Sequence, residues 1–171
     1  MATAPIFICH AFSEDDLARD LSLALETFRL GVWRDTRGVR GSERLAPEVR
    51  WAIEQARQVI VVLGLDTEEC AWLRREIEVA QGVERRRGDN TYRVIPLLLP
   101  GTDHSVLATW FTPIPRTPPI QLTPEGVGAA LPALLAALGE PPLGNTVIER
   151  SPPPLAELEL LSRSLRVLVQ D

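Results

Sequence analysis

Residues 6–15 read Ile-Phe-Ile-Cys-His-Ala-Phe-Ser-Glu-Asp, and this stretch indicates the fold class of the chain. The four apolar residues at 6–9 are typical of a short strand, which stops at His10. Residues 13–16 are Ser, Glu, Asp and Asp, which favour the start of a helix. The stretch therefore predicts a strand that leads directly into a helix.

The same alternation of strand and helix continues as far as residue 138. Apolar runs predict further strands at 32–33, 59–63, 93–99 and 120–122. Apolar residues at helical spacing predict helices at 45–56, 72–83, 127–138 and 17–28, the last of these ended by Gly31. Residues 101–119 are rich in Pro and Thr and predict an irregular connection with a short helix at 106–110. The alternation indicates an α/β domain, with a parallel sheet covered by helices on both faces.

The chain changes in composition after residue 139. Residues 140–154 contain a cluster of prolines and predict an extended linker. Residues 155–171 predict a helix whose apolar face needs a partner. We therefore expect a domain at 1–139, a Pro-rich linker at 140–154 and a helix at 155–171. This helix either begins a C-terminal sensor or oligomerisation module or folds back onto the domain.

Composition argues against several classes of function. The formal net charge is -5 and the arginines are spread along the chain, so direct binding to nucleic acid is not expected. The apolar runs are far shorter than the roughly 20 residues that span a bilayer. The N-terminus has no basic region before an apolar stretch, so it does not resemble a signal peptide. We expect a cytoplasmic protein that binds no membrane.

Metal and nucleophile chemistry also have little support in the sequence. The chain contains two cysteines and two histidines, which is too few for the common zinc patterns. Cys9 and His10 are neighbours in or beside a strand, so their side chains are expected to point to opposite faces of the sheet. A catalytic Cys-His pair is therefore disfavoured.

One acidic residue interrupts the apolar face of the helix predicted at 72–83. With about 100° of rotation per residue, Glu76 lies near the middle of an apolar arc. The arc consists of Trp72, Leu73, Ile77, Val79, Ala80 and Val83. The opposite, solvated side is predicted to hold Arg74, Arg75, Glu78 and Gln81. A carboxylate on an inward face is costly unless it is paired or lies in a cavity. Glu76 therefore either bonds a backbone group or an arginine at the sheet edge, or does chemistry in a cavity.

Several stretches resemble the Toll/interleukin-1 receptor (TIR) domains of bacteria. Residues 6–15 are similar to the family's FISHASEDK opening, with one residue more in the turn. Residues 31–35, GVWRD, resemble its G-x-x-V-W-x-D strand, and Gly41 lies where the next loop carries its glycine. Residues 70–76, CAWLRRE, resemble S-x-W-x-x-x-E. Cys9 and Cys70 replace the usual serines, and Gly64 stands where a serine commonly closes the third strand.

The resemblance implies both a fold and an activity. The fold would be the flavodoxin-like TIR fold, with five parallel strands in the order 2-1-3-4-5. The activity would be cleavage of the nicotinamide–ribose bond of NAD or NADP by Glu76, in an effector of bacterial immunity or toxicity. NAD would be the substrate, and neither a further cofactor nor a metal would be needed. Other TIR domains would be partners by homotypic assembly, with residues 36–45 as a contact element.

The substrate pocket is expected beyond the carboxyl ends of the strands. The first loop would contribute His10, Ala11 and Phe12, with Phe12 as the stacking residue. The end of the second strand and the loop after it would contribute Trp33, Asp35 and Gly41, and the helix would contribute Trp72, one turn before Glu76. Other interpretations remain open, because Trp33 and Trp72 also suit the core and Asp35 also suits a turn.

Two other classes of function are alternatives to the enzyme. The first is a non-catalytic module that self-associates or recruits other TIR domains. The second is a flavin carrier or a phospho-receiver, which shares the flavodoxin-like topology. A receiver needs an aspartate at the end of the third strand, where this chain has Gly64, with Asp66 two residues later in the loop. Gly64 thus disfavours a receiver, and Glu76 on an apolar helix face favours the enzyme over the non-catalytic module.

Overall fold

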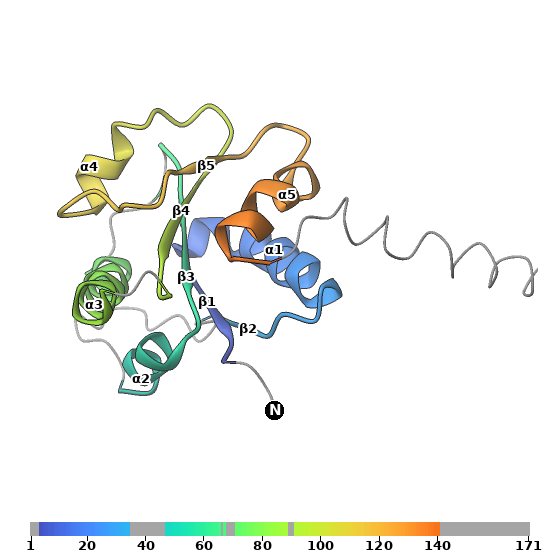
Figure 1. Ribbon diagram of the computed structural model, residues 1–171. Coiled ribbons are helices and arrows are strands. Elements are labelled where there is room, and N and C mark those ends of the chain that lie inside the picture. The colour runs from blue at the N-terminus through green and yellow to red at the C-terminus, as the bar shows by residue number, and fades with distance from the viewer. Residues whose placement is uncertain (1–3, 35–46, 66, 68–70, 89–90, 141–171) are drawn as a thin grey trace, which may run out of the picture. The chain divides into compact units, whose positions relative to one another are not determined.

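The computed structural model describes residues 4–34, 47–65, 67, 71–88 and 91–140 (Figure 1). The chain divides into two units, Met1–Leu138 and Gly139–Asp171, and the first is the one described below. The predicted linker at 140–154, apart from Glu140, and the predicted helix at 155–171 lie outside the described residues, so the domain boundaries stay a prediction. Within the described residues, no helix is long and apolar enough to cross a membrane.

The first unit is built on a five-stranded parallel sheet in the order β2-β1-β3-β4-β5. The strands are β1 (Ile6–Cys9), β2 (Val32–Arg34), β3 (Val59–Leu63), β4 (Val94–Leu98) and β5 (Ile120–Gln121). Phe7 pairs with Trp33 on one side and with Val59 on the other, so the carboxyl ends of β1, β2 and β3 share one edge of the sheet. The predicted fold class and strand order are confirmed.

Helices cover both faces of the sheet, as predicted (Figure 1). One face carries α1 (Asp15–Thr27), which follows the short 3-10 helix η1 (Phe12–Glu14), together with α5 (Val127–Ala137). The other face carries α2 (Pro47–Gln55), α3 (Ala71–Arg87) and α4 (Val106–Trp110). The short helix predicted at 106–110 is therefore present.

The core beneath α2 and α3 is made by alternate residues of the strands. Phe7 and Cys9 of β1 belong to it, together with Leu73, Ile77 and Ala80 of α3. Because side chains alternate along a strand, Ile6 and Ile8 face α1 and α5 instead. The alternation in β1 thus decides which residues reach α3 and which reach α1.

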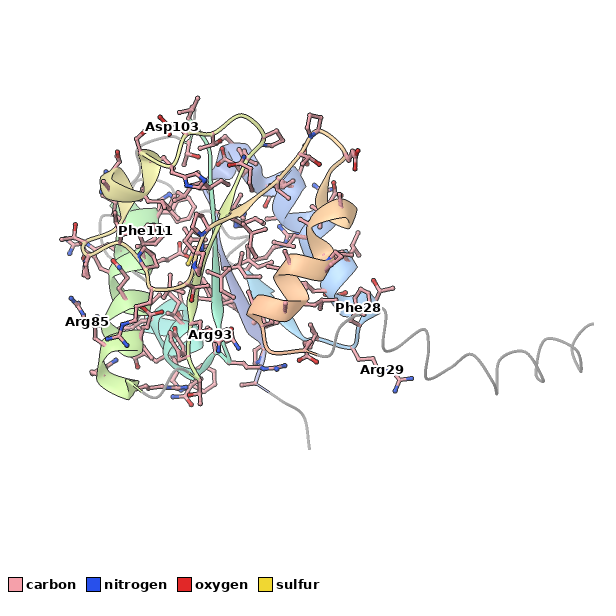
Figure 2. All side chains as sticks on the ribbon, turned by 45° about the horizontal axis from the view of Figure 1, so that its top comes forward. Phe28, Arg29, Arg85, Arg93, Asp103 and Phe111 are labelled. Atoms are coloured by element: carbon pink, nitrogen blue, oxygen red, sulfur yellow. The ribbon has the colours of Figure 1, made fainter. Side chains whose placement is uncertain are left out.

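The end of the first helix differs from the prediction. Helix α1 ends at Thr27, and the residue that turns the chain is Arg29, with a φ of 62°. Its backbone N–H bonds the Glu26 carbonyl and that of Leu30 bonds the Leu25 carbonyl, a pattern that needs a left-handed residue and usually selects glycine. Gly31 instead lies before β2 and accepts the Ile6 N–H at 2.8 Å. Phe28 and Arg29 lie at the exposed end of α1 (Figure 2).

The solvated side of the third helix also needs a correction. Gln81, predicted to face solvent, is buried and forms hydrogen bonds with the backbone of the segment after α4. Its Nε2 donates to the Pro113 carbonyl at 2.6 Å, and its Oε1 accepts the Thr112 N–H at 3.3 Å. The position of Gln81 on the helix does not predict this contact. Both partners lie about 30 residues later in the sequence, in an irregular segment.

Candidate functional site

Glu76 lies on the inward face of α3, as its position in the apolar arc predicted. Its side chain is 1% exposed, between the buried side chains of Leu73, Ile77 and Ala80. Arg75 and Glu78, on either side of it in sequence, are exposed and pair with each other at 3.5 Å. The helix therefore buries one carboxylate and leaves its charged neighbours in water.

The carboxylate of Glu76 meets the thiol of Cys9, the last residue of β1. Cys9 is completely buried. Burial raises the pKa of the Cys9 thiol well above its ordinary value, and the charge of Glu76 and its hydrogen bond with Cys9 raise it further. Cys9 is therefore protonated near neutral pH, so its S–H donates to Glu76. A protonated, buried thiol is a poor nucleophile.

His10 faces the opposite side of the sheet, as the strand alternation predicted. It is buried, and its Nε2 lies 3.0 Å from Oδ1 of Asp15, the first residue of α1. Arg34, the last residue of β2, donates to the same oxygen at 2.7 Å. The structure therefore joins His10 to α1 and β2 and keeps it away from Glu76.

Asp15 is held in its charged form by these neighbours. Partial burial by itself would raise the pKa of Asp15, but the hydrogen bond with His10 and the charges of Arg34 and Arg19 outweigh it and lower the pKa. A carboxylate with two such partners fixes the end of β2 relative to the start of α1. Sequence reasoning missed Asp15 and Arg34 as partners, because they are 19 residues apart.

A second buried carboxylate ties the loop after β1 to the loop after β3. The Gly64 N–H donates to Thr67 Oγ1 at 2.7 Å, and the Thr67 hydroxyl donates to Glu14 Oε1 at 3.2 Å. The Ser13 hydroxyl donates to the other oxygen of Glu14 at 2.8 Å. Glu14 is 7% exposed, and its bonds to Ser13 and Thr67 are partly buried. Both loops at the carboxyl edge are thereby held in place.

At the end of β3, Gly64 lies close to the side chain of a neighbouring residue. A Cβ atom placed there would collide with the side chain of Leu99, which follows β4. Gly64 is also buried, so the Leu99 side chain fills the space that a serine side chain would need. This packing leaves little room for the serine expected here by resemblance.

The structure places some of the predicted pocket residues on the same face of the sheet as Glu76. Ala11 is fully buried in the core beneath α2 and α3, and Trp33 and Trp72 pack against that core while partly buried. The Trp33 ring stacks on Phe7 with centroids 4.8 Å apart. Trp33 is therefore part of the core packing as well as of the sheet edge.

The other predicted pocket residues include three that lie wholly or in part outside the described part of the structure. Phe12 begins η1, but its side chain lies outside the described part of the structure, as do Asp35 and Gly41. In the described residues, no group of three His, Cys, Asp or Glu side chains is arranged to hold a metal ion. The positioned centre of the candidate site is thus Glu76 with Cys9, bordered by Trp72.

Comparisons with known proteins agree with this architecture. The sequence model of the TIR domain family matches residues 6–128. No curated protein matches the chain. The TIR domains of the activated Roq1 resistosome, which directly recognizes the pathogen effector XopQ, superimpose with a TM-score of 0.50 at 17% identity. The match covers 61% of this chain and 62% of that chain, so this chain spans less than two thirds of its length.

A second solved structure is a Burkholderia pseudomallei protein described as pilus assembly-related. It has a TM-score of 0.48 and 13% identity, over 81% of this chain and 92% of that chain. At these identities, the resemblance to the Roq1 domains shows the fold alone.

Proposed function

Because the match over residues 6–128 shows that this chain belongs to the TIR domain family, we propose that it is an enzyme that cleaves the nicotinamide–ribose bond of NAD or NADP. The observation that carries the proposal is the burial of Glu76, a carboxylate that is 1% exposed on an otherwise apolar helix face. Such burial is unfavourable unless the carboxylate is paired or lies in a cavity, so the position of Glu76 calls for an explanation, and catalysis supplies one.

A single carboxylate suffices for this reaction. Nicotinamide is a cationic leaving group, so it departs without protonation, and the acid of an ordinary glycosidase pair is unnecessary. Glu76 orients the ribose hydroxyls and stabilises the positive charge that develops on the ribose ring. The bond from C1′ to the nicotinamide nitrogen breaks and a bond from C1′ to water forms, with one proton released. When the adenine of the same molecule attacks instead, the product is cyclic.

Cys9 acts in this scheme as a positioning residue. Its S–H donates to the Glu76 carboxylate from the end of β1, which fixes the side-chain rotamer of Glu76. A carboxylate has several lone pairs, so Glu76 can accept further hydrogen bonds from a ribose. Trp72, one turn earlier and partly buried, would border the nicotinamide in this scheme.

The burial of Glu76 also bears on regulation. A carboxylate that is 1% exposed is closed to a dinucleotide, so the residues that cover it must move before substrate binds. We propose that assembly with other TIR domains supplies this change, with residues 36–45 as a contact element. The Roq1 TIR domains lie within an activated resistosome, which supports homotypic assembly as the means. A sensor or oligomerisation module beyond the linker would trigger it, in a cytoplasmic effector of bacterial immunity or toxicity.

The competing function is a TIR module that self-associates or recruits other TIR domains without catalysis. It is favoured by the same closed state of Glu76, because a buried, hydrogen-bonded carboxylate also holds α3 against β1. Both functions involve assembly of TIR domains, and only the enzyme also cleaves NAD.

Release of nicotinamide from NAD and from NADP, measured by chromatography over a wide range of protein concentration, separates the two functions. The enzyme predicts a specific activity that rises with concentration as the chains assemble. Absence of nicotinamide release from assembled protein, with both dinucleotides, would favour the non-catalytic module.

A further inference from the structure

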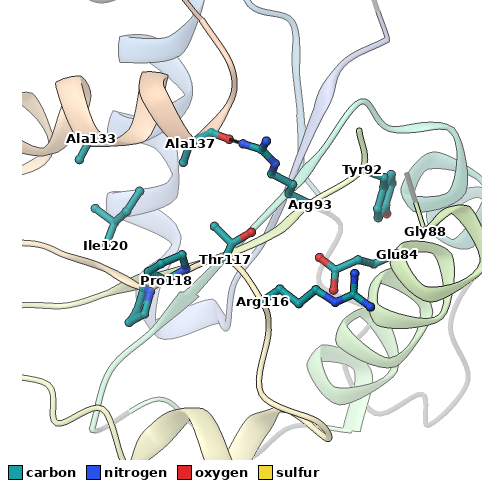
Figure 3. A pocket seen from close by; sticks show the side chains of 11 residues that line it. Glu84, Gly88, Tyr92, Arg93, Arg116, Thr117, Pro118, Ile120, Ala133 and Ala137 are labelled. Carbon is teal, nitrogen blue, oxygen red and sulfur yellow. Dashed lines mark hydrogen bonds between the residues drawn. The ribbon is translucent and has the colours of Figure 1, made fainter. Parts of the chain in front are cut away.

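A pocket with a volume of about 440 Å³ lies at the opposite end of α3 from the candidate site (Figure 3). It is lined by Glu84 near the end of α3, by Ile120 at the start of β5 and by Ala137 at the end of α5. Glu84 is eight residues beyond Glu76, which places it about 12 Å farther along the helix axis. The pocket therefore lies near the amino ends of the strands and shares no residue with the Glu76 site.

The size and lining of the pocket suit a small organic molecule. Its volume lies within the range of roughly 300–1,000 Å³ that is usual for ligand sites. One wall is apolar, made by Pro118, Ile120 and Ala133, which lie together in Figure 3. Such a wall accommodates an aromatic or aliphatic body.

The hydrogen-bonding groups of the pocket define the polar part of the ligand. Glu84 already accepts the Val94 N–H at 2.8 Å, and Arg93 already donates to the Ala137 carbonyl at 2.9 Å. In contrast, neither Arg116 nor the hydroxyl of Thr117 makes a hydrogen bond or an ion pair within the part of the chain that the structure describes. These adjacent donors leave the pocket able to bind an acceptor.

The charged residues of the pocket lining also favour an anionic ligand. Arg93, Arg116 and Glu84 are the charged residues of the lining, so two guanidinium groups face one carboxylate and one positive charge is in excess. In Figure 3, Arg116 extends across the pocket toward Glu84, and the two form no ion pair. A guanidinium without a partner is well suited to hold a carboxylate or a phosphate.

We propose that this pocket is a second binding site, for a small organic anion. Its carboxylate or phosphate binds Arg116 and Thr117, and its apolar body packs on Pro118, Ile120 and Ala133. Glu84 repels the anion and so limits its affinity. The site is independent of the proposed activity of Glu76.

Isothermal titration of the full chain tests this assignment with phenyl phosphate, inorganic phosphate and benzyl alcohol as probes. Phenyl phosphate carries both the charge and the apolar body, so it should bind at least about tenfold more tightly than either of the others. Arg116→Gln should weaken its binding about tenfold, because a charged hydrogen bond is lost. Glu84→Gln keeps an acceptor for the Val94 N–H, removes the negative charge and should tighten binding.

Arg85→Gln is the matched control, since Arg85 is exposed on α3, lies outside the pocket lining and points away from the sheet (Figure 2). It should leave the affinity for phenyl phosphate unchanged. The proposal is overturned if phenyl phosphate binds no better than inorganic phosphate. It is equally overturned if Arg116→Gln has no effect, or if Arg85→Gln and Arg116→Gln weaken binding to the same extent.

Discussion

The thiol of Cys9 and the carboxylate of Glu76 share a hydrogen bond between the end of β1 and the inward face of α3. This bond joins the sheet to the helix at the carboxyl edge, where ligands of open parallel sheets bind. The pKa of the Cys9 thiol is raised by burial and by Glu76, so the thiol keeps its proton near neutral pH.

The first prediction concerns the reactivity of Cys9. In a Cys70→Ser variant, Cys9 is the sole thiol of the chain. Because burial and then the charge of Glu76 raise its pKa, it should react with Ellman's reagent at about pH 8 at least ~100-fold more slowly than in concentrated urea. Fast modification of the folded protein would show that Cys9 is accessible or ionised, against the structure.

The second prediction concerns Asp15 and acid pH. Its folded pKa is lowered below the ordinary value of 3.8, so its charge stabilises the fold above that pH and the contribution is lost as the pH falls through the folded value. Asp15→Asn should lower the free energy of unfolding by about 1 kcal/mol at about pH 5, a modest value because the side chain is 32% exposed. The difference from wild type should shrink toward about pH 3, as followed by urea unfolding.

Asp16→Asn provides the control for Asp15. Asp16 is the next residue and pairs only with Arg19 among the described residues, at 3.1 Å, with a side chain that is 96% exposed. The same loss of charge there should leave the unfolding free energy almost unchanged. Equal effects of the two substitutions would mean that net charge, rather than the bonds to His10 and Arg34, governs the response.

The third prediction concerns the packing of Gly64. Gly64→Ala forces a Cβ atom into the Leu99 side chain and should reduce stability by about 1–3 kcal/mol. Shortening the opposing side chain in a Gly64→Ala, Leu99→Ala double variant should cost less than the sum of the two single changes. Additive effects in thermal or urea unfolding would show that the two residues do not compete for the same space.

Local patterns in the sequence were sufficient to predict most of the sheet and the position of Glu76. A short, β-branched apolar run such as Val59–Leu63 is typical of a buried strand, and the burial of Glu76 follows from its neighbours within one helix. The strand order, in contrast, came from family resemblance, because periodicity does not specify which strands are neighbours.

The features that were missed depend on contacts between distant segments. Glu14 and Thr67 are 53 residues apart, and Gln81 is held by backbone groups about 30 residues later. Residues of these types are common on surfaces, so the sequence gives no signal that they are buried partners. The end of α1 was also missed. The left-handed position after a helix is usually filled by glycine, and here it is filled by Arg29.

The central claim is that Glu76 performs the cleavage of NAD, and the kinetics of a matched pair of variants test it most directly. Glu76→Gln preserves shape and removes the charge, while Glu78→Gln makes the same change on the exposed side of α3, where the carboxylate is 66% exposed. Both are compared with wild type in steady-state nicotinamide release under assembling conditions. Glu76→Gln should lower kcat at least about 100-fold without loss of folding, because the stabilising charge is removed, and Glu78→Gln should leave it unchanged. Wild-type turnover by folded Glu76→Gln protein would contradict the account.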